Sequence, residues 1–244
     1  MSQRVVEAVN SHPSRRTLYI SLALLLAAFA IRVWTLSTSS VWWDEAFTWQ
    51  TTSHGWDNLW HLLQTGDRNP PLYFLSLMVW GSVAGWSEFS LRFLSVIYGL
   101  LGVACLARLA QRLFGSTASL WTLALAALSP ALTLYSQEGR AYALFFACAM
   151  ATVYFGFLIL EFGLNHRAWR AFLIAEILLL LTHYFAVPIV LAINVLIVVR
   201  LWRQHAAWRM CLKWIAGQLL AALPLLIWTL LIFRTPGSLT TAAE

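Results

Sequence analysis

Charged residues are scarce in this sequence. Of its 244 residues, 60% are hydrophobic and only 11% are charged, whereas a soluble domain usually carries about 25% charged residues. Uncharged runs cover 69–87, 93–107, 113–137, 141–160, 177–199 and 214–233. Several of these runs reach the roughly 20 residues that cross a bilayer core as a helix. The composition argues against a soluble enzyme and predicts an all-α polytopic membrane protein with about seven or eight apolar helices.

Cysteines and nucleotide-binding motifs are also scarce or absent. The three cysteines, Cys105, Cys148 and Cys211, lie in apolar segments, which argues against a disulfide or metal framework. The sequence has no P-loop, GxGxxG, HExxH or CxxC motif, so soluble-nucleotide and zinc chemistry have no motif support. The net charge of +6 comes from basic residues between the apolar runs. The positive-inside bias explains this placement, and no nucleic-acid partner is expected.

The basic residues predict how the chain crosses the membrane. They cluster at 15–16, 108–112, 167–170 and 200–213. With these clusters inside the cell, residues 1–16 are a cytoplasmic tail, and the acidic loop 37–69 and the turn 137–140 lie outside. Two apolar segments then separate loop 37–69 from Arg108, although an odd number of crossings is required. Either 70–86 is an interfacial or re-entrant helix, or the inside assignment of Arg108 is wrong.

The long loop 37–69 combines acids with tryptophan. Its stretch SVWWDEAFTWQ (40–50) places Asp44 beside Glu45, and the loop holds five of the fourteen tryptophans. Tryptophan at this density suits a membrane interface, so we predict one or two interfacial helices over 45–64. Adjacent residues do not share a helix face, so at most one of the two acids is expected to face a reacting centre. Asp44 is either an N-cap or a base in a cleft walled by tryptophan.

The stretch LYSQEGRAYALF (134–145) is a second candidate. Glu138 and Arg140 interrupt a long apolar region there, with Tyr142 close behind. Charges beside a membrane span are costly and are functional candidates. The pair is either a surface hairpin with a salt bridge or part of a phosphate site, in which Arg140 would offer its planar fork of donors.

Two further stretches contribute candidates. TGDRNPP (65–71) supplies Asp67 and Arg68, either as a polar turn before a proline-started helix or as site residues. LTHYFAVP (181–188) supplies His183 and Tyr184, which at an outer membrane boundary are more often interface anchors than catalysts.

Two charged residues inside apolar segments have simple structural explanations. For Arg92, the simplest account is an i,i+4 ion pair with Glu88. Glu176 lies within a span and is either a hydrogen-bonded interior acid or an acid near a water-filled cavity.

Six motifs in a fixed order carry a family resemblance. They are WWDEAF, DRNPPLYFLSL, SEFSLRFLSVIYGLLG, ARLAQRLFG, ALSPALTLYSQEGRAYAL and LTHYF. Together they resemble membrane glycosyltransferases of the dolichyl-phosphate-mannose protein mannosyltransferase type, whose bacterial relatives include the lipid A aminoarabinose transferase and the rhizobial core-oligosaccharide transferases. The resemblance covers residues 17–200.

The resemblance implies a multi-pass enzyme of the bacterial inner membrane. It would move a sugar from a polyprenyl phosphate to an acceptor hydroxyl on a glycan, a lipid A-like lipid or a protein at the outer face. The resemblance implies that Asp44, with Glu45, acts on the acceptor. The expected phosphate ligands are Arg140, Arg68 and His183, and the other candidates are Glu138, Tyr142, Asp67 and Tyr184. No metal ligand is assigned, and a divalent metal beside Asp44 stays open.

Members of this family run for several hundred residues more, so the resemblance predicts that residues 17–234 are an N-terminal transferase module and 235–244 a tail, with the downstream part absent. A transporter or flippase for lipid-linked sugars, and an inactive truncated membrane fragment, are the alternatives. Two observations favour a transferase: the acids cluster in an outer loop, and no repeated half of the kind common in transporters is visible.

Overall fold

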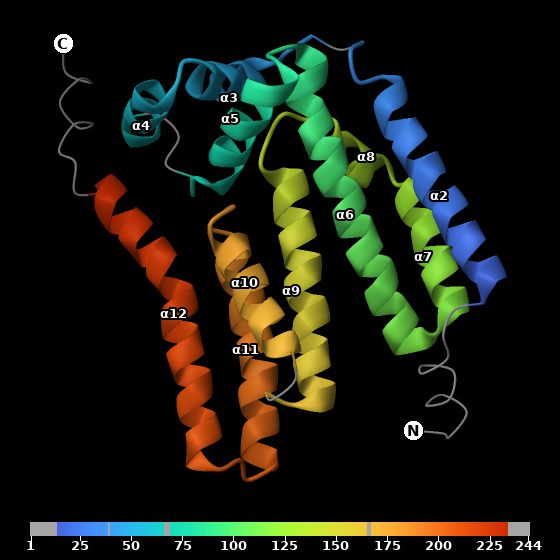
Figure 1. Cartoon of the computed structure of the whole chain (residues 1–244), viewed down its shortest axis with the longest axis vertical. Coiled ribbons are helices and arrows are strands. Elements are labelled where there is room, and N and C mark those ends of the chain that lie inside the picture. The colour runs from blue at the N-terminus through green and yellow to red at the C-terminus, as the bar shows by residue number, and fades with distance from the viewer. Residues whose placement is uncertain (1–13, 39, 66–68, 165–166, 234–244) are drawn as a thin grey trace. The chain divides into compact units, whose positions relative to one another are not determined.

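The computed structural model describes residues 14–38, 40–65, 69–164 and 167–233, and every regular element in these ranges is an α-helix (Figure 1). The helices are α2 (Arg15–Trp34), α3 (Trp43–Ser53), α4 (Trp56–Thr65), α5 (Leu72–Ala84), α6 (Glu88–Phe114), α7 (Ser116–Leu128), α8 (Pro130–Ser136), α9 (Tyr142–Phe162), α10 (Ala168–Leu180), α11 (Ala186–Arg203) and α12 (Trp208–Phe233).

The predicted all-α polytopic membrane fold is confirmed. Five helices in the described part of the chain are long and apolar enough to cross a membrane, namely α2, α6, α9, α11 and α12. The bent pair α7 and α8 would make a sixth span. The helices expected in the first loop are also present, because α3 and α4 occupy the stretch predicted for them.

The length of helix α5 matters for the number of membrane crossings between loop 37–69 and Arg108, which must be odd. It has 13 residues, so at 1.5 Å per residue it is about 20 Å long, well short of the ~30 Å hydrocarbon core. It follows Pro71 and ends at Gly85, whose φ of 80° favours glycine. The length of α5 favours the interfacial or re-entrant alternative. In that alternative α6 is the single crossing between loop 37–69 and Arg108, which would agree with the charge pattern.

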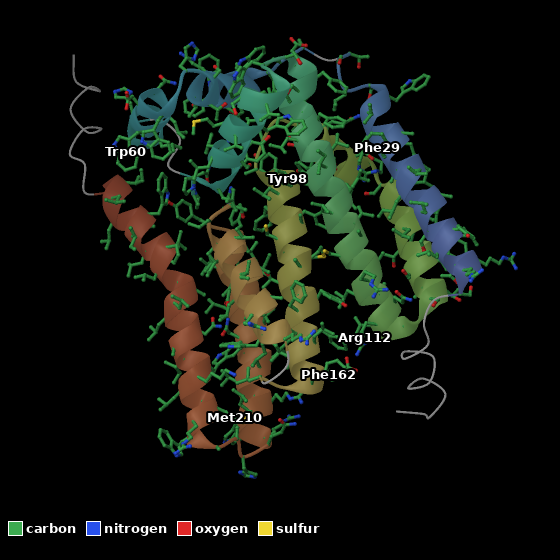
Figure 2. All side chains as sticks on the ribbon, viewed as in Figure 1. Phe29, Trp60, Tyr98, Arg112, Phe162 and Met210 are labelled. Carbon is green, nitrogen blue, oxygen red and sulfur yellow. The ribbon has the colours of Figure 1, made fainter. Side chains whose placement is uncertain are left out.

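One compact unit contains the described residues up to Glu45 together with Ser87–Tyr154. Within it α2, α6, α7 and α8 pack against one another. Their core includes Val103, Ala107, Leu123 and Ala126. Phe29 of α2, labelled in Figure 2, packs its ring edge-on against Phe93 of α6 with 6.1 Å between centroids.

Arg32 explains how this unit accommodates a broken helix. In a continuous helix the carbonyl of Ala126 would accept from the amide of residue 130, which is Pro130 and has no N–H. The axes of α7 and α8 differ by 64° at this point. Arg32, fully buried on α2, donates from Nη2 to the carbonyl of Ala126 (3.0 Å) and from Nε to Ser136 Oγ (3.3 Å). One side chain therefore satisfies the carbonyl that proline leaves open and joins α2 to both sides of the break.

The second unit contains Ala46–Trp86 and the described residues from Phe155 onward. In it α10 packs against α11 and α12, and α12 also contacts α4. Trp60, labelled in Figure 2, meets Trp228 edge-on with 6.4 Å between ring centroids. The contacts with α4 involve the C-terminal end of α12, and Met210 marks the opposite end of this helix (Figure 2).

Glu176 of α10 is an interior acid of this second unit. It is fully buried, and its two carboxyl oxygens accept from Asn194 Nδ2 of α11 and Gln218 Nε2 of α12, each at 3.1 Å. Of the two expected alternatives, the structure supports the hydrogen-bonded interior acid.

We predict that Arg32 and Pro130 are energetically coupled. Arg32→Met should leave the Ala126 carbonyl without a donor, whereas Pro130→Ala supplies an amide that can take its place. The coupling energy from a double-mutant cycle should reach about 1 kcal/mol or more, the range for residues that share a hydrogen-bond network. Thermal unfolding in detergent measures it. Exposed Arg16→Met in the same cycle with Pro130→Ala is the matched control. Coupling as small as that of Arg16 would contradict the role given to Arg32.

Candidate active site

The acidic pair Asp44–Glu45 lies in the first turn of α3. This helix begins at Trp43, two residues before the expected start, so Asp44 is not its N-cap as one reading proposed. Carboxylates in the first turn still complement the positive end of the helix dipole. The two side chains differ sharply in exposure: Glu45 is 1% exposed, while Asp44 is half-buried. The expectation that at most one of the two faces a reacting centre stays a prediction, and the exposure of the side chains favours Asp44 for that position.

Glu45 is held by a buried guanidinium and a backbone amide. Arg92 Nε donates to Glu45 Oε1 at 2.9 Å, and Arg92 Nη2 donates to Oε2 at 2.6 Å. The amide of Gly139 adds a third hydrogen bond to Oε1 at 2.8 Å. This bidentate geometry with charged partners is among the strongest hydrogen-bond arrangements available to a side chain.

The partner of Arg92 corrects the sequence-based expectation. The ion pair that the structure gives Arg92 is with Glu45, not the expected local pair with Glu88. Arg92 is 2% exposed, and a buried charge needs a compensating charge and full hydrogen bonding. It also donates to the carbonyls of Leu36 (2.9 Å) and Ser40 (3.1 Å). Arg92 therefore joins α6 to the end of α2 and to the start of α3.

The turn 137–140 packs directly against this pair. Gly139 is buried there, and a Cβ at this position would lie 2.7 Å from Leu91 Cγ, so only glycine fits without displacing Leu91. Gln137 Nε2 donates to the carbonyl of Arg32 at 2.8 Å and approaches Thr35 Oγ1 at 3.0 Å. The loop that follows α2 and the turn that follows α8 therefore meet at one end of the first unit, as the predicted topology requires.

Glu138 and Arg140 flank Gly139, and both are half-buried. Burial is the main factor that raises the pKa of Glu138 above that of an ordinary glutamate, and the charge of Glu45 raises it further. The charge of Arg140 opposes this increase, while Asp44 adds to it. Four ionisable groups from two distant parts of the chain thus interact here, and Glu138 keeps its proton to a higher pH than usual.

Tyr142 and Tyr135 border this turn. Tyr142 is the first residue of α9, and its ring meets that of Tyr135 edge-on with 5.2 Å between centroids. This aromatic contact braces the residues immediately after Arg140.

His183 and Tyr184 belong to the second unit, in the link between α10 and α11. Both are half-buried, and the His183 ring stacks on Phe185 with 4.9 Å between centroids. The amide of Phe185 donates to His183 Nδ1 at 3.2 Å, so in the neutral ring the proton sits on Nε2. The same link is tied to α5, because the amide of Leu72 donates to the carbonyl of Leu181 at 3.0 Å.

The last two candidate site residues are Asp67 and Arg68, and the last question is whether the described residues could bind a metal ion. Asp67 and Arg68 lie outside the described residues. Among the residues that are described, no group of three or more His, Cys, Asp or Glu side chains could hold a metal ion. The three cysteines are free: Cys148 is buried, while Cys105 and Cys211 are partly buried.

Sequence reasoning missed the importance of Arg92 and made no use of Arg32. Both interrupt apolar stretches, and a charge at membrane depth is a functional or structural candidate by default. This rule, applied to Glu138 and Arg140, would have selected both arginines. It would not have named their partners, because these lie far away along the chain.

Comparison with known proteins gives one match. A family model described as dolichyl-phosphate-mannose-protein mannosyltransferase matches residues 68–228, about two thirds of the chain. No curated protein and no solved structure matches the chain. The matched region includes Arg92, the turn 137–140 and His183, whereas Asp44 and Glu45 precede it.

We predict that neutralising Glu45 destabilises the fold. Glu45→Gln keeps the shape but leaves the buried charge of Arg92 uncompensated, and such a change typically costs about 3–5 kcal/mol. Thermal unfolding in detergent should show a clear fall in midpoint. The double change Glu45→Leu/Arg92→Met should recover part of the loss, because neither charge remains.

Glu88→Gln is the matched control, since Glu88 lies one turn from Arg92 on α6. We expect it to change stability by less than about 0.5 kcal/mol, as exposed or half-exposed positions usually do. If Glu88→Gln were as damaging as Glu45→Gln, the local pair would be the important one after all.

Proposed function

The chain belongs to the dolichyl-phosphate-mannose-protein mannosyltransferase family of membrane glycosyltransferases, and from this premise we propose that it transfers a sugar from a polyprenyl phosphate to an acceptor hydroxyl at the outer membrane face. The observation that carries the proposal is the cluster of Asp44, Glu138 and Arg140 around the buried Glu45–Arg92 pair. In this proposal the cluster supplies a base, Asp44, and a phosphate ligand, Arg140, at one end of one helical unit.

Asp44 is the proposed base. It is the acid of the adjacent pair that is partly exposed, since Glu45 is enclosed by Arg92 and Gly139. Asp44 accepts the proton of the acceptor hydroxyl as the oxygen attacks the anomeric carbon. The bond from that carbon to the phosphate oxygen breaks, and its electron pair leaves with the polyprenyl phosphate. A single displacement of this kind inverts the anomeric configuration.

Arg140 is the proposed ligand of the donor phosphate. Its guanidinium is permanently charged and presents planar donors that match phosphate oxygens. It lies next to the turn that Glu45 fixes through Gly139. As the sugar departs, negative charge grows on the phosphate, and a donor held in place by the fold stabilises it.

Glu45 is proposed as a positioning residue rather than a second base. Its two oxygens are committed to Arg92 and Gly139, so it fixes the start of α3, and with it Asp44, against the turn that carries Arg140. This proposal differs from the sequence-based assignment, in which Glu45 stood beside Asp44 as a catalytic candidate.

His183 and Arg68 are proposed as phosphate ligands on the family resemblance alone. A hydrogen bond from His183 would come from Nε2, because Nδ1 accepts from Phe185. The proposed acceptors are a glycan, a lipid or a protein, and the proposed location is the inner membrane of a bacterium. The rival function, transport of lipid-linked sugars, draws no support from Glu176, because Asn194 and Gln218 enclose that acid.

Asp44→Asn tests the proposed base. It keeps the side-chain size and removes the basic oxygen, so transfer from a panel of polyprenyl-phosphate sugars should fall by about 10²-fold or more. The unfolding midpoint should stay close to that of the wild type, unlike that of Glu45→Gln. Wild-type activity in Asp44→Asn, with no activity in folded Glu45→Gln at low temperature, would assign the base to Glu45 instead.

Substitutions of Arg140 test the phosphate role. Arg140→Lys keeps the charge but loses the fork, so turnover with the lipid-linked donor should fall moderately, whereas Arg140→Ala should nearly abolish it. Apparent affinity for the acceptor should change little in either variant. If Arg140 only balances Glu138 at the surface, the double variant Glu138→Ala/Arg140→Ala should turn over like the wild type, since exposed pairs contribute about 0–1 kcal/mol. That result would refute the role.

A further inference from the structure

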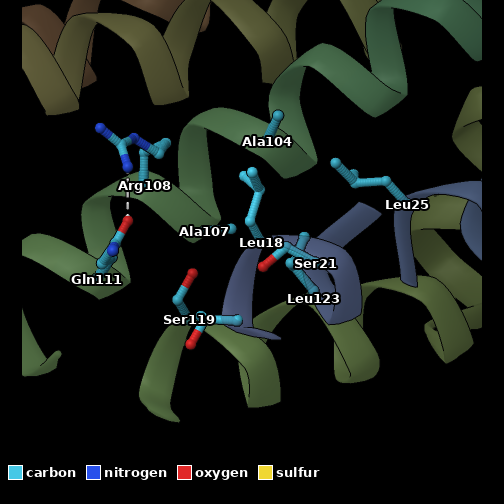
Figure 3. A pocket seen from close by; sticks show the side chains of 10 residues that line it. Leu18, Ser21, Leu25, Ala104, Ala107, Arg108, Gln111, Ser119 and Leu123 are labelled. Atoms are coloured by element: carbon cyan, nitrogen blue, oxygen red, sulfur yellow. Dashed lines mark hydrogen bonds between the residues drawn. The ribbon is translucent and has the colours of Figure 1, made fainter. Parts of the chain in front are cut away.

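A cavity opens between α2, α6 and α7, at the end of the first unit opposite to the proposed active site. It has a volume of about 190 Å³. Its wall is apolar, formed by Leu18 and Leu25 of α2, Ala104 and Ala107 of α6, and Leu123 of α7. Figure 3 shows these side chains converging from the three helices. The space suits part of an aliphatic chain and lies among helices that a bilayer surrounds.

The rim of the cavity is polar and basic. Arg108 and Gln111 line it from the last turns of α6, and Ser21 and Ser119 line it from α2 and α7. The Arg108 guanidinium is exposed, and its Nη1 donates to Gln111 Oε1 at 2.6 Å (Figure 3). That bond uses one of five guanidinium N–H donors and orients the group beside the opening. Arg15 and Arg16 begin α2 and Arg112 lies in the last turn of α6, so the same end of the unit carries further positive charge.

The apolar wall and the basic rim of this cavity favour a ligand with both an apolar part and an anionic part. A soluble anion would use the basic rim but gain nothing from the apolar wall. A neutral lipid would use the wall but not the positive charge. An anionic phospholipid satisfies both, with one acyl chain in the cavity and its phosphate at Arg108. Basic pockets between transmembrane helices are a recurrent binding mode for anionic head groups on the cytoplasmic side, which is the side that the positive-inside pattern predicts for this end.

We propose that the cavity between α2, α6 and α7 binds one anionic glycerophospholipid of the membrane, with its phosphate on Arg108. The site is separate from the lipid-linked donor site, which lies at the other end of the unit, and it does not depend on the proposed sugar transfer. The lipid contacts α2, α6 and α7, so its binding stabilises the packing of these three helices.

Native mass spectrometry of the delipidated full chain, titrated with phosphatidylglycerol or phosphatidylcholine, tests the proposal. The wild type should bind one phosphatidylglycerol about fivefold more tightly than phosphatidylcholine, the factor expected from one basic residue near an anionic lipid. Arg108→Ala should remove this preference, and Arg108→Lys should keep most of it. Ala104→Leu, which fills the cavity, should weaken the binding of both lipids.

Arg203→Ala is the matched control, because Arg203, like Arg108, is an exposed arginine near the C-terminal end of its helix, which is α11. It should retain the wild-type preference. Equal binding of the two lipids by the wild type would overturn the proposal. So would a loss in Arg203→Ala as large as that in Arg108→Ala, which would indicate general attraction to surface charge.

Two other occupants are tested directly. Glycerol phosphate, which lacks acyl chains, should not compete with phosphatidylglycerol; efficient competition would indicate a site for soluble anions and overturn the lipid assignment. A diazirine-bearing aliphatic residue in place of Leu18 should crosslink to phospholipid on illumination. Crosslinking to a peptide from residues 1–13 instead would show that the chain fills its own cavity.

Discussion

The ion pair between Arg92 and Glu45 is the interaction on which the geometry of the proposed site depends. A guanidinium buried in an apolar helix is very costly unless its charge is compensated and its donors are satisfied. Glu45 supplies the charge, and the carbonyls of Leu36 and Ser40 take further donors. Because these acceptors come from the end of α2 and the start of α3, the need to satisfy one side chain fixes the path of the chain between those helices. The amide of Gly139 then brings the turn after α8 to the same point.

A second buried arginine, Arg32, also stabilises this end of the first unit, but through hydrogen bonds to carbonyl and hydroxyl groups. Among the residues that the structure describes, the hydrogen-bond acceptors of Arg32 are carbonyls and a hydroxyl, and none is a carboxylate. Its position is explained by Pro130, which breaks the helix and leaves a carbonyl open. The break turns the chain by 64°, and Gln137 then hydrogen-bonds back to the carbonyl of Arg32 itself. Pro130 causes the bend, and Arg32 donates to the carbonyl that the bend leaves open. The bend and this hydrogen bond place Glu138 and Arg140 near the first turn of α3.

Much of the fold followed from the sequence, because uncharged runs of about 20 residues have few alternatives to membrane helices. The topology stays a prediction from the alternation of basic clusters and acidic loops, and the short α5 favours one of the two solutions to the parity problem. The site was predicted less well. That Asp44, Glu138 and Arg140 belong together could be inferred from topology and resemblance. Which acid is buried could not, because it depends on the helix starting at Trp43. The partner of Arg92 was missed because pair rules along a helix are local, whereas Glu45 is 47 residues away.

The charge balance of the cluster suits an anionic donor. The cluster contains three carboxyl groups, those of Asp44, Glu45 and Glu138. Their negative charges would repel a phosphate unless neighbouring groups or protonation reduced them. Arg92 neutralises Glu45 inside the fold, and the positive charge of Arg140 lies beside the remaining acids of the cluster. Glu138 is left over, and its raised pKa means that it holds a proton at pH values where an ordinary glutamate would not. A protonated Glu138 adds no negative charge beside Arg140, so it would not repel a phosphate that approaches this arginine. Ionisation of Glu138 would make the cluster negative and oppose donor binding. Burial of Glu138, together with the charge of Glu45, therefore lowers the negative charge that the proposed donor phosphate would meet at Arg140.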